Sequence, residues 1–371
     1  MVAKGAELEE LVRAYFARQG FYALRGVSLD FEGEQVTDID VWLYGRQSAS
    51  LRTRSIVDVK DKRSPKAFER IMWTRGMQLA LGCDKAIVAT TDSSPKVARF
   101  AQQQTVDLLS KEFLQKLEKR IDTKERLTME QFGETIRQYA EQKQDGDWLG
   151  RMSDAKSAVV SLSGYPAFNV CMTAFGFFAS RAETRPQHFD QAIRCVYHTA
   201  SLACIALDMA LGRVVYEDSA TRSRTIATGV TYGDNGDARV QHSIKSVLAV
   251  IAEAMPNGKV IARQAQDAME TLFANVRADI VAEFFGKEHN AATLFNVGRE
   301  LDDRAYAVDT RAHDLSIEAK SVLGVFADFV QAKRSTLFHE RASGASTNPP
   351  NATTGTGSTA TPQTGSQAKL I

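Results

Sequence analysis

The chain has 371 residues, which is long for one ordinary hydrophobic core and sufficient for two domains and a tail. Its 46 basic and 45 acidic residues nearly balance, but residues 1–120 hold 20 and 16 of them, a net charge of +4 against −3 for the rest. The four cysteines form no CxxC pair, which argues against a zinc site and suits a reducing compartment. The first residues contain no apolar signal segment, so we expect a cytoplasmic protein.

The first 110 residues alternate between helical and strand-like patterns. In chain order, the apolar spacing and the cap residues predict a helix ending at Gly20, strands over 21–29, 36–44 and 54–60, a helix from Ser64-Pro65 to Gly82, a strand over 85–90, a helix over 97–103 capped by Ser94-Pro95, and a strand over 105–109. A polar turn is expected over 30–34. The order is αβββαβ followed by a further αβ, which predicts an α/β domain over residues 1–110.

The rest of the chain carries few strand signals. Residues 111–150 are polar and charged and predict a helical connector, and 151–341 have apolar residues at helical spacing, so we expect an all-helical domain. Residues 342–371 have almost no apolar side chain, which predicts a disordered tail. The uncharged stretch 157–180 is long enough to span a bilayer, but Gly164-Tyr165-Pro166 interrupts it, so we interpret it as a buried helix.

Two neighbouring strands of the α/β domain carry acids on one face. Asp58 and Lys60 are two residues apart on a strand, so both side chains project from the same face, and Asp40 points away from the apolar face of the preceding strand. If the strands pair, Asp40 and Asp58 converge on one divalent cation, with Lys60 beside an attacking water. Carboxylates suit Mg²⁺ or Mn²⁺, and all six histidines lie beyond this domain, which excludes a histidine-based nuclease mechanism within it.

This element order, with Asp40 and Asp58-Val59-Lys60 on adjacent strands, resembles the PD-(D/E)XK superfamily of restriction-endonuclease-like proteins. The similarity is greatest to the branch of Mrr-type restriction enzymes and archaeal Holliday-junction resolvases. It implies a metal-dependent endonuclease acting on DNA in prokaryotic restriction, antiviral defence or DNA repair. Ile39 stands where the family signature has proline.

The resemblance also implies further site residues. In that branch a glutamate of the first helix joins the metal site, and the Lys4-Gly5 start and Gly20-Phe21 end of the pattern align it with Glu9. Gln78 in the second helix is implied as a catalytic residue, and Val59 as a member of the metal-binding set. The near competitors of Glu9 are Glu7 and Glu10.

A run of basic residues follows the acids, and we expect it to contact nucleic-acid phosphates; it comprises Lys62, Arg63, Lys66 and Arg70. The helical domain is expected to provide oligomerisation or docking of a partner protein. Two alternatives stay open: a non-catalytic nucleic-acid-binding or scaffold protein that keeps the nuclease fold, and a ribonuclease.

Overall fold

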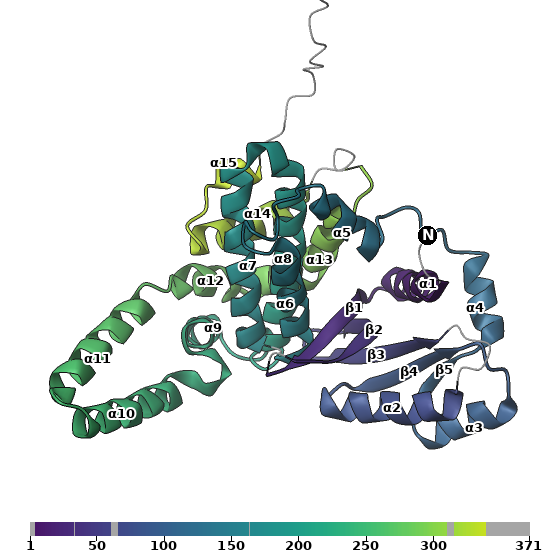
Figure 1. Cartoon of the computed structure of the whole chain (residues 1–371), viewed down its shortest axis with the longest axis horizontal. Coiled ribbons are helices and arrows are strands. Elements are labelled where there is room, and N and C mark those ends of the chain that lie inside the picture. The colour runs from purple at the N-terminus through teal and green to yellow at the C-terminus, as the bar shows by residue number, and fades with distance from the viewer. Residues whose placement is uncertain (1–3, 33, 61–65, 163, 310–314, 339–371) are drawn as a thin grey trace, which may run out of the picture. The chain divides into compact units, whose positions relative to one another are not determined.

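The chain is described here by a computed structural model, which covers residues 4–32, 34–60, 66–162, 164–309 and 315–338 (Figure 1). A five-stranded mixed sheet with helices comes first, and a helical region follows it. The first part contains α1 (Lys4–Arg18), β1 (Tyr22–Phe31), β2 (Glu34–Arg46), β3 (Arg52–Lys60), α2 (Ala67–Ala80), β4 (Lys85–Thr90), α3 (Pro95–Gln103), β5 (Asp107–Leu109) and α4 (Lys111–Glu118). The predicted order of helices and strands is confirmed.

The helical region confirms the second part of the sequence prediction. Its helices are α5 (Met129–Arg137), α6 (Trp148–Ser161), α7 (Gly164–Thr184), α8 (Phe189–Leu211), α9 (Ser219–Tyr232), α10 (Gly236–Ala254), α11 (Gly258–Ala274), α12 (Ala278–Phe285), α13 (Glu288–Ala305), α14 (Ile317–Phe329) and α15 (Arg334–Leu337), with 3₁₀ turns η1 (Pro186–His188) and η2 (Gly233–Asn235). The predicted tail, 342–371, lies outside the described residues.

The strands follow the sheet in chain order, β1-β2-β3-β4-β5. β1, β2 and β3 pair antiparallel, whereas β3, β4 and β5 pair parallel because α2 and α3 cross over between them. This arrangement places the end of β3 at the point where the antiparallel and parallel parts of the sheet meet.

Side chains of alternating direction bury both faces of the sheet. On one face, Val41, Leu43, Val57 and Val59 pack with α1 and α4. On the other face, α2 and α3 cover β4 through a small cluster that includes Ile71 and Val88. The remaining half of that face, with Trp42, Tyr44 and Ile56, belongs to the same core as the long helices α7 and α8. This half of the face therefore shares a hydrophobic core with the helical region, and the other two clusters belong to the sheet and its own helices.

Asp208 of α8 fixes the β2–β3 hairpin to the helical region. Its fully buried carboxylate accepts a hydrogen bond of 2.5 Å from the Tyr44 hydroxyl and pairs with Arg46 at 2.9 Å and Arg52 at 3.1 Å. Two guanidinium groups thus share one counter-charge at this contact. A second link is the hydrogen bond of 2.8 Å between Tyr22 and Ser201.

β1 adopts a left-handed backbone conformation at Gly26, beside Asp40 in the middle of β2. Gly26 has φ +57°, a backbone conformation that favours glycine, and a Cβ there would lie 2.7 Å from the end of the flexible Met129 side chain. Lys156 of α6 donates from Nζ to the carbonyl oxygens of Arg25 (2.7 Å) and Gly26 (2.9 Å). The register of β1 and β2 sets Gly26 opposite Asp40, where the regular ladder is interrupted.

Two local expectations need correction. The polar turn predicted over 30–34 does connect the two strands, but it is shorter than expected, because β1 continues to Phe31 and β2 begins at Glu34. The second helix begins at Ala67 after Lys66, whose backbone is left-handed and provides no side-chain cap, so the predicted start at Ser64-Pro65 is two residues early; that pair lies outside the described residues. By contrast, Ser94 does cap α3, accepting from the Lys96 backbone N–H.

The uncharged stretch 157–180 is shared between the end of α6 and most of α7. Over the part of the chain that the structure covers, we find no helix long and apolar enough to cross a membrane. Cys171, Cys195 and Cys204 are fully buried thiols in the helical core, as the sequence predicts.

Candidate functional site

Asp40 and Asp58 lie across from each other where β2 and β3 leave their ladder. The paired register runs from Arg46–Arg52 to Val41–Val57, and Asp40 and Asp58 occupy the next opposed positions. The Asp40 carboxylate accepts a hydrogen bond of 2.7 Å from the Val59 backbone N–H. A side chain therefore replaces a strand carbonyl as acceptor, which holds Asp40 against β3.

Lys60 joins the two acids. Its Nζ lies 3.2 Å from Asp40 Oδ2 and 3.5 Å from Asp58 Oδ1. The sequence prediction that these three residues gather at one place is therefore met by the geometry. Burial raises the pKa of Asp40, whereas the hydrogen bond from Val59 and the charge of Lys60 lower it and the charge of Asp58 raises it.

Arg70 of α2 is a fourth member of this group. Its Nε donates to Asp58 Oδ2 at 2.8 Å and its Nη2 pairs with Asp58 Oδ1, so the guanidinium engages both oxygens of a carboxylate that is 1% exposed. The guanidinium also lies 4.2 Å from the centre of the Trp73 ring. The sequence placed Arg70 on nucleic-acid phosphates, but here its partner is an acid of the site.

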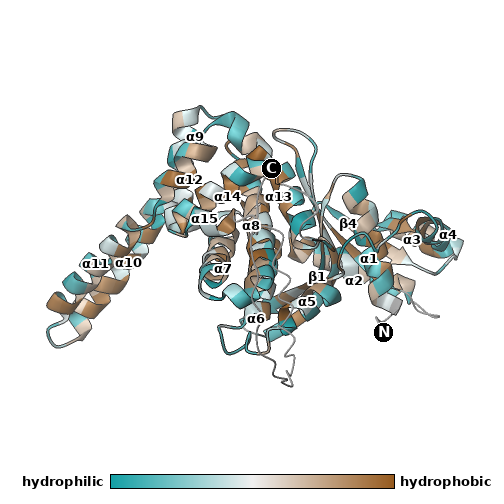
Figure 2. Cartoon of the chain, turned by 90° about the horizontal axis from the view of Figure 1, so that it is seen from above, coloured by the Kyte–Doolittle hydropathy of each residue, from teal (hydrophilic) through white to brown (hydrophobic). Residues whose placement is uncertain are grey.

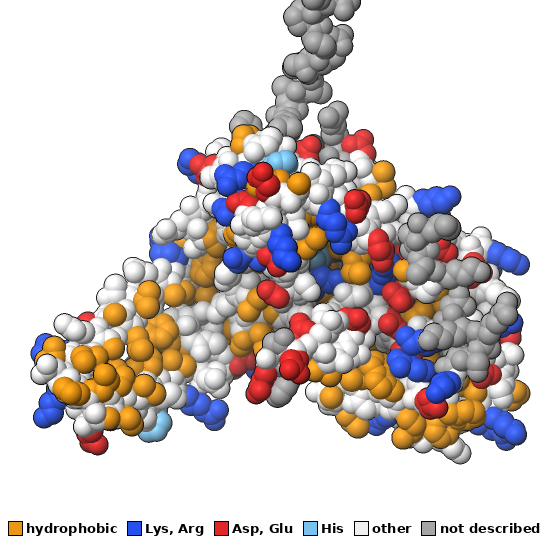
Figure 3. Space-filling view, viewed as in Figure 1, with side chains coloured by type: hydrophobic (Ala, Val, Ile, Leu, Met, Phe, Trp, Pro, Cys, Tyr) orange, Lys and Arg blue, Asp and Glu red, His pale blue; other side chains and the backbone are white. Residues whose placement is uncertain are grey.

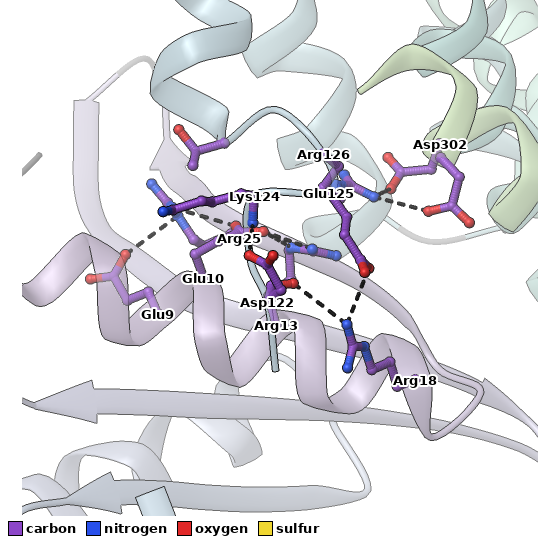
Figure 4. Close-up of polar contacts among 12 residues, drawn as sticks. Glu9, Glu10, Arg13, Arg18, Arg25, Asp122, Lys124, Glu125, Arg126 and Asp302 are labelled. Carbon is purple, nitrogen blue, oxygen red and sulfur yellow. Dashed lines mark hydrogen bonds and ion pairs between the residues drawn. The ribbon is translucent and has the colours of Figure 1, made fainter. Parts of the chain in front are cut away.

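Glu9 reaches the same region from α1 through Arg25 of β1. Arg25 Nε lies 3.6 Å from Glu9 Oε2, and Figure 4 shows Glu9 and Glu10 both directed toward this guanidinium. Burial, and next the charge of Asp40, raise the pKa of Glu9 to about 7, while Arg25 and Lys60 lower it. Of the two acids, Asp40 is the one whose charge raises the pKa of Glu9, and the contact of Glu9 that the structure shows is the ion pair with Arg25.

Arg25 was not singled out by the sequence, although it is almost fully buried. Its guanidinium pairs with Glu9, Glu10 and Glu130, and so connects α1 to α5 of the helical region (Figure 4). Nothing in the local pattern marks it, because an arginine in a strand is ordinarily a solvated residue. Its burial depends on α5 and α6, which follow it by about a hundred residues.

The remaining predicted residues lie elsewhere. Gln78 is buried at the far end of α2, where it donates to the Asp84 carbonyl at 2.9 Å and accepts from Arg75 at 2.6 Å, so the structure does not bring it to the acids. Lys66 forms an exposed pair with Glu69 at 3.2 Å. Lys62 and Arg63 lie outside the described residues.

A cavity beside α1 is separate from the acid pair. About 510 Å³ lies between α1, residues 122–126 and α13, with Arg13, Arg18, Arg126 and Arg299 among its lining residues. Asp302 on its wall pairs with Arg126 at 2.9 Å (Figure 4). Asp40, Asp58 and Lys60 do not line it.

A hard divalent cation requires oxygen ligands, and Asp40 and Asp58 supply carboxylate oxygens. Within the described residues no group of three or more His, Cys, Asp or Glu side chains is close enough to hold a metal ion. Mg²⁺, however, is usually bound by one or two carboxylates together with water and substrate oxygens. Asp40 and Asp58 already share one cationic group, Lys60, so the two acids fit such an ion once Arg70 gives up an oxygen of Asp58.

Comparison of the chain with protein-family models, with curated proteins and with solved structures finds no match. Function is therefore inferred from the arrangement of the site.

Proposed function

We propose that the protein is a Mg²⁺-dependent endonuclease that hydrolyses DNA phosphodiester bonds, with a restriction-endonuclease-like core in its first 110 residues. The observation that carries this proposal is that Asp40, in the middle of β2, meets Asp58 and Lys60 at the end of β3, with Lys60 Nζ within 3.5 Å of both carboxylates. The resemblance in element order and in these three residues supports it. A cytoplasmic location is part of the same proposal.

Asp40 and Asp58 would hold the cation, with Glu9 and the Val59 position beside it. The bound cation would neutralise charge on the scissile phosphate and lower the pKa of a water. Lys60 holds a positive charge between the two acids, where it stabilises negative charge that develops on a phosphate. Glu9, whose pKa is raised to about 7, can accept a proton from a nearby water at neutral pH.

The substrate class follows from the positive charge near the acids. Lys66 is exposed near the start of α2, and the N-terminal 120 residues carry a net charge of +4, from 20 basic and 16 acidic residues. Positive charge beside the acids favours a polyanion. DNA is the proposed substrate because of the resemblance to restriction-endonuclease-like proteins, and RNA is tested beside it.

The test uses the purified full-length protein with plasmid, linear and branched DNA and with RNA, each in Mg²⁺, Mn²⁺ and EDTA. Cleavage is expected with either metal and none in EDTA. Asp58→Asn and Lys60→Ala are expected to abolish cleavage but not binding. Asp107→Asn is the matched control, because it makes the same change on exposed β5.

The outcomes separate the three hypotheses. Persistent cleavage in EDTA, or wild-type cleavage by Asp58→Asn and Lys60→Ala, contradicts the proposed site. Salt-sensitive binding of DNA without any cleavage favours the non-catalytic scaffold. Cleavage of RNA but not of any DNA identifies a ribonuclease at the same residues.

A further inference from the structure

The antiparallel hairpin of α10 and α11 carries an exposed apolar face. Val247 and Val250 of α10 are 56% and 64% exposed, and Leu272 of α11 is 68% exposed. Figure 2 shows apolar residues along both helices, and Figure 3 shows apolar side chains gathered over the hairpin. The buried cores described above include no residue of α10 or α11 among those the structure describes. The stability of the core therefore does not explain why these side chains are apolar.

The apolar residues of each helix form a regular seam. In α10, Val240, Val247 and Ala254 recur every seven residues, with the apolar Val250 between the last two and the polar Ser243 at the equivalent position between the first two. In α11 the corresponding residues follow spacings of four, three and four; they are Ile261, Ala265, Ala268 and Leu272. This alternation of three and four residues is the pattern by which helices pack into coiled coils and bundles.

The hairpin does not use these seams for its own internal packing. Leu248 of α10 and Ala262 of α11 are buried, and Gly258 lets the helices approach, because a Cβ there would lie 2.2 Å from the Ile251 carbonyl oxygen. In each helix a seam residue, Val247 or Ile261, comes one position before the buried residue, about a quarter turn away. Because the helices are antiparallel, this offset puts both seams on the same face of the hairpin.

The charges beside the α10 seam indicate which partner can bind this face of the hairpin. Arg239 and Glu253 directly precede seam residues Val240 and Ala254, and both are exposed. If a second α10 runs antiparallel, Arg239 of each copy lies opposite Glu253 of the other, and Val247 meets Val247 on the two-fold axis. In a parallel copy Arg239 would face Arg239. Charged residues that flank a seam select partner and direction, so this pattern is complementary to itself under a two-fold axis.

We infer that the α10–α11 hairpin is a dimerisation arm, and that two copies of this chain join their hairpins in an antiparallel four-helix bundle. The 19 residues of α10 give the face a length of about 28 Å, and two helices give it a width of about 20 Å. The two copies together then bury about 1,100 Å², which is near the lower limit for a specific interface. The dimer is therefore expected to dissociate reversibly on dilution.

The inference is independent of the proposed nuclease activity and is tested on the full chain by sedimentation velocity between about 0.5 and 100 µM. The wild type should approach twice its 40.8 kDa mass at the upper concentrations. Arg239→Glu should raise the dimer dissociation constant by about tenfold, because each of two ion pairs becomes a repulsion. Val247→Lys places two like charges on the two-fold axis and should leave a monomer.

The double variant Arg239→Glu with Glu253→Arg decides between this pairing and any other. It restores opposite charges between copies and should recover the wild-type dissociation constant. The two positions are 14 residues apart on one helix, about 21 Å, so they cannot rescue each other within a single chain. Arg263→Glu is the control, since Arg263 is exposed on α11 two residues from Ile261 and from Ala265, away from the seam.

Circular dichroism of every variant verifies that the helices are retained. A wild type that stays monomeric at 100 µM overturns the inference, whether or not another protein binds the hairpin. A dimer that persists in Val247→Lys, or a double variant as weak as Arg239→Glu alone, also overturns it.

Discussion

Replacing Glu9 by glutamine tests the electrostatics of the site without requiring any activity. The folded protein raises the pKa of Glu9 from its ordinary value of 4.5 to about 7, chiefly by burial and then by the charge of Asp40. Between these two pH values the unfolded chain loses the Glu9 proton while the folded chain keeps it. The free energy of unfolding therefore falls as pH rises from 4.5 to about 7 and levels off above it.

The size of the effect follows from the same shift. Each pH unit between the two pKa values costs about 1.4 kcal/mol, so ionised Glu9 destabilises the fold by at most about 3 kcal/mol above pH 7. The Glu9 side chain is 23% exposed, so solvent screens only part of this. Glu9→Gln removes the titrating group, and its stability relative to wild type should increase by up to about 3 kcal/mol between pH 4.5 and pH 8.

Urea unfolding, followed by circular dichroism at several pH values, measures the difference. Glu7→Gln is the control, because Glu7 is an exposed acid two residues away on the same helix. Mg²⁺ should stabilise the wild type more at pH 8 than at pH 6, since a cation near Glu9 favours its ionised form. Parallel pH profiles for wild type and Glu9→Gln would refute the reasoning, because they would show that Glu9 titrates alike in both states.

Three further predictions concern single contacts. Asp58→Asn and Lys60→Ala should each lower the cleavage rate by about a hundredfold or more, measured on plasmid DNA, whereas Asp107→Asn should not. Arg70→Gln should tighten Mn²⁺ binding in calorimetry by about tenfold, because Asp58 then loses a competing cation; weaker binding would mean that Arg70 positions Asp58 for the metal. Asp208→Ala should destabilise the fold by about 3–5 kcal/mol in urea unfolding, because Arg46 and Arg52 lose their shared buried counter-charge; a loss under about 1 kcal/mol would contradict this.

The order of helices and strands was predictable because it depends on local spacing. Period-two patterns mark β2 and β3, and the cap Ser94-Pro95 marks the start of α3. Local patterns mispredicted the structure where contacts with other parts of the chain determine it. Asp30 and Glu34 are polar residues that suggest a loop, yet both lie in strands, because pairing across the β1–β2 hairpin satisfies their backbone groups.

The site was predictable to the extent that it lies on paired strands. Alternation along β3 places Asp58 and Lys60 on one face, and strand pairing brings Asp40 opposite Asp58. Gln78 was implied only by resemblance. Gln78 follows Arg70 by eight residues on α2, about 12 Å along the helix. Its side-chain amide donates to the Asp84 carbonyl at the buried end of the helix instead.

The structure gives Arg70 a different partner from the one that the sequence predicts, and the difference has a physical cause. The sequence predicts that Arg70 lies in the first turns of a helix that follows the acids. No local pattern encodes how α2 crosses β3, and this crossing directs the Arg70 guanidinium to Asp58. A guanidinium recognises a carboxylate and a phosphate with the same two-pronged geometry. The ion pair with Asp58 therefore leaves the phosphate role open: a cation bound by Asp58 would compete with Arg70 for that carboxylate, and a released Arg70 would lie beside the acids. The Arg70→Gln measurement distinguishes these cases, because only competition predicts tighter metal binding when the guanidinium is removed.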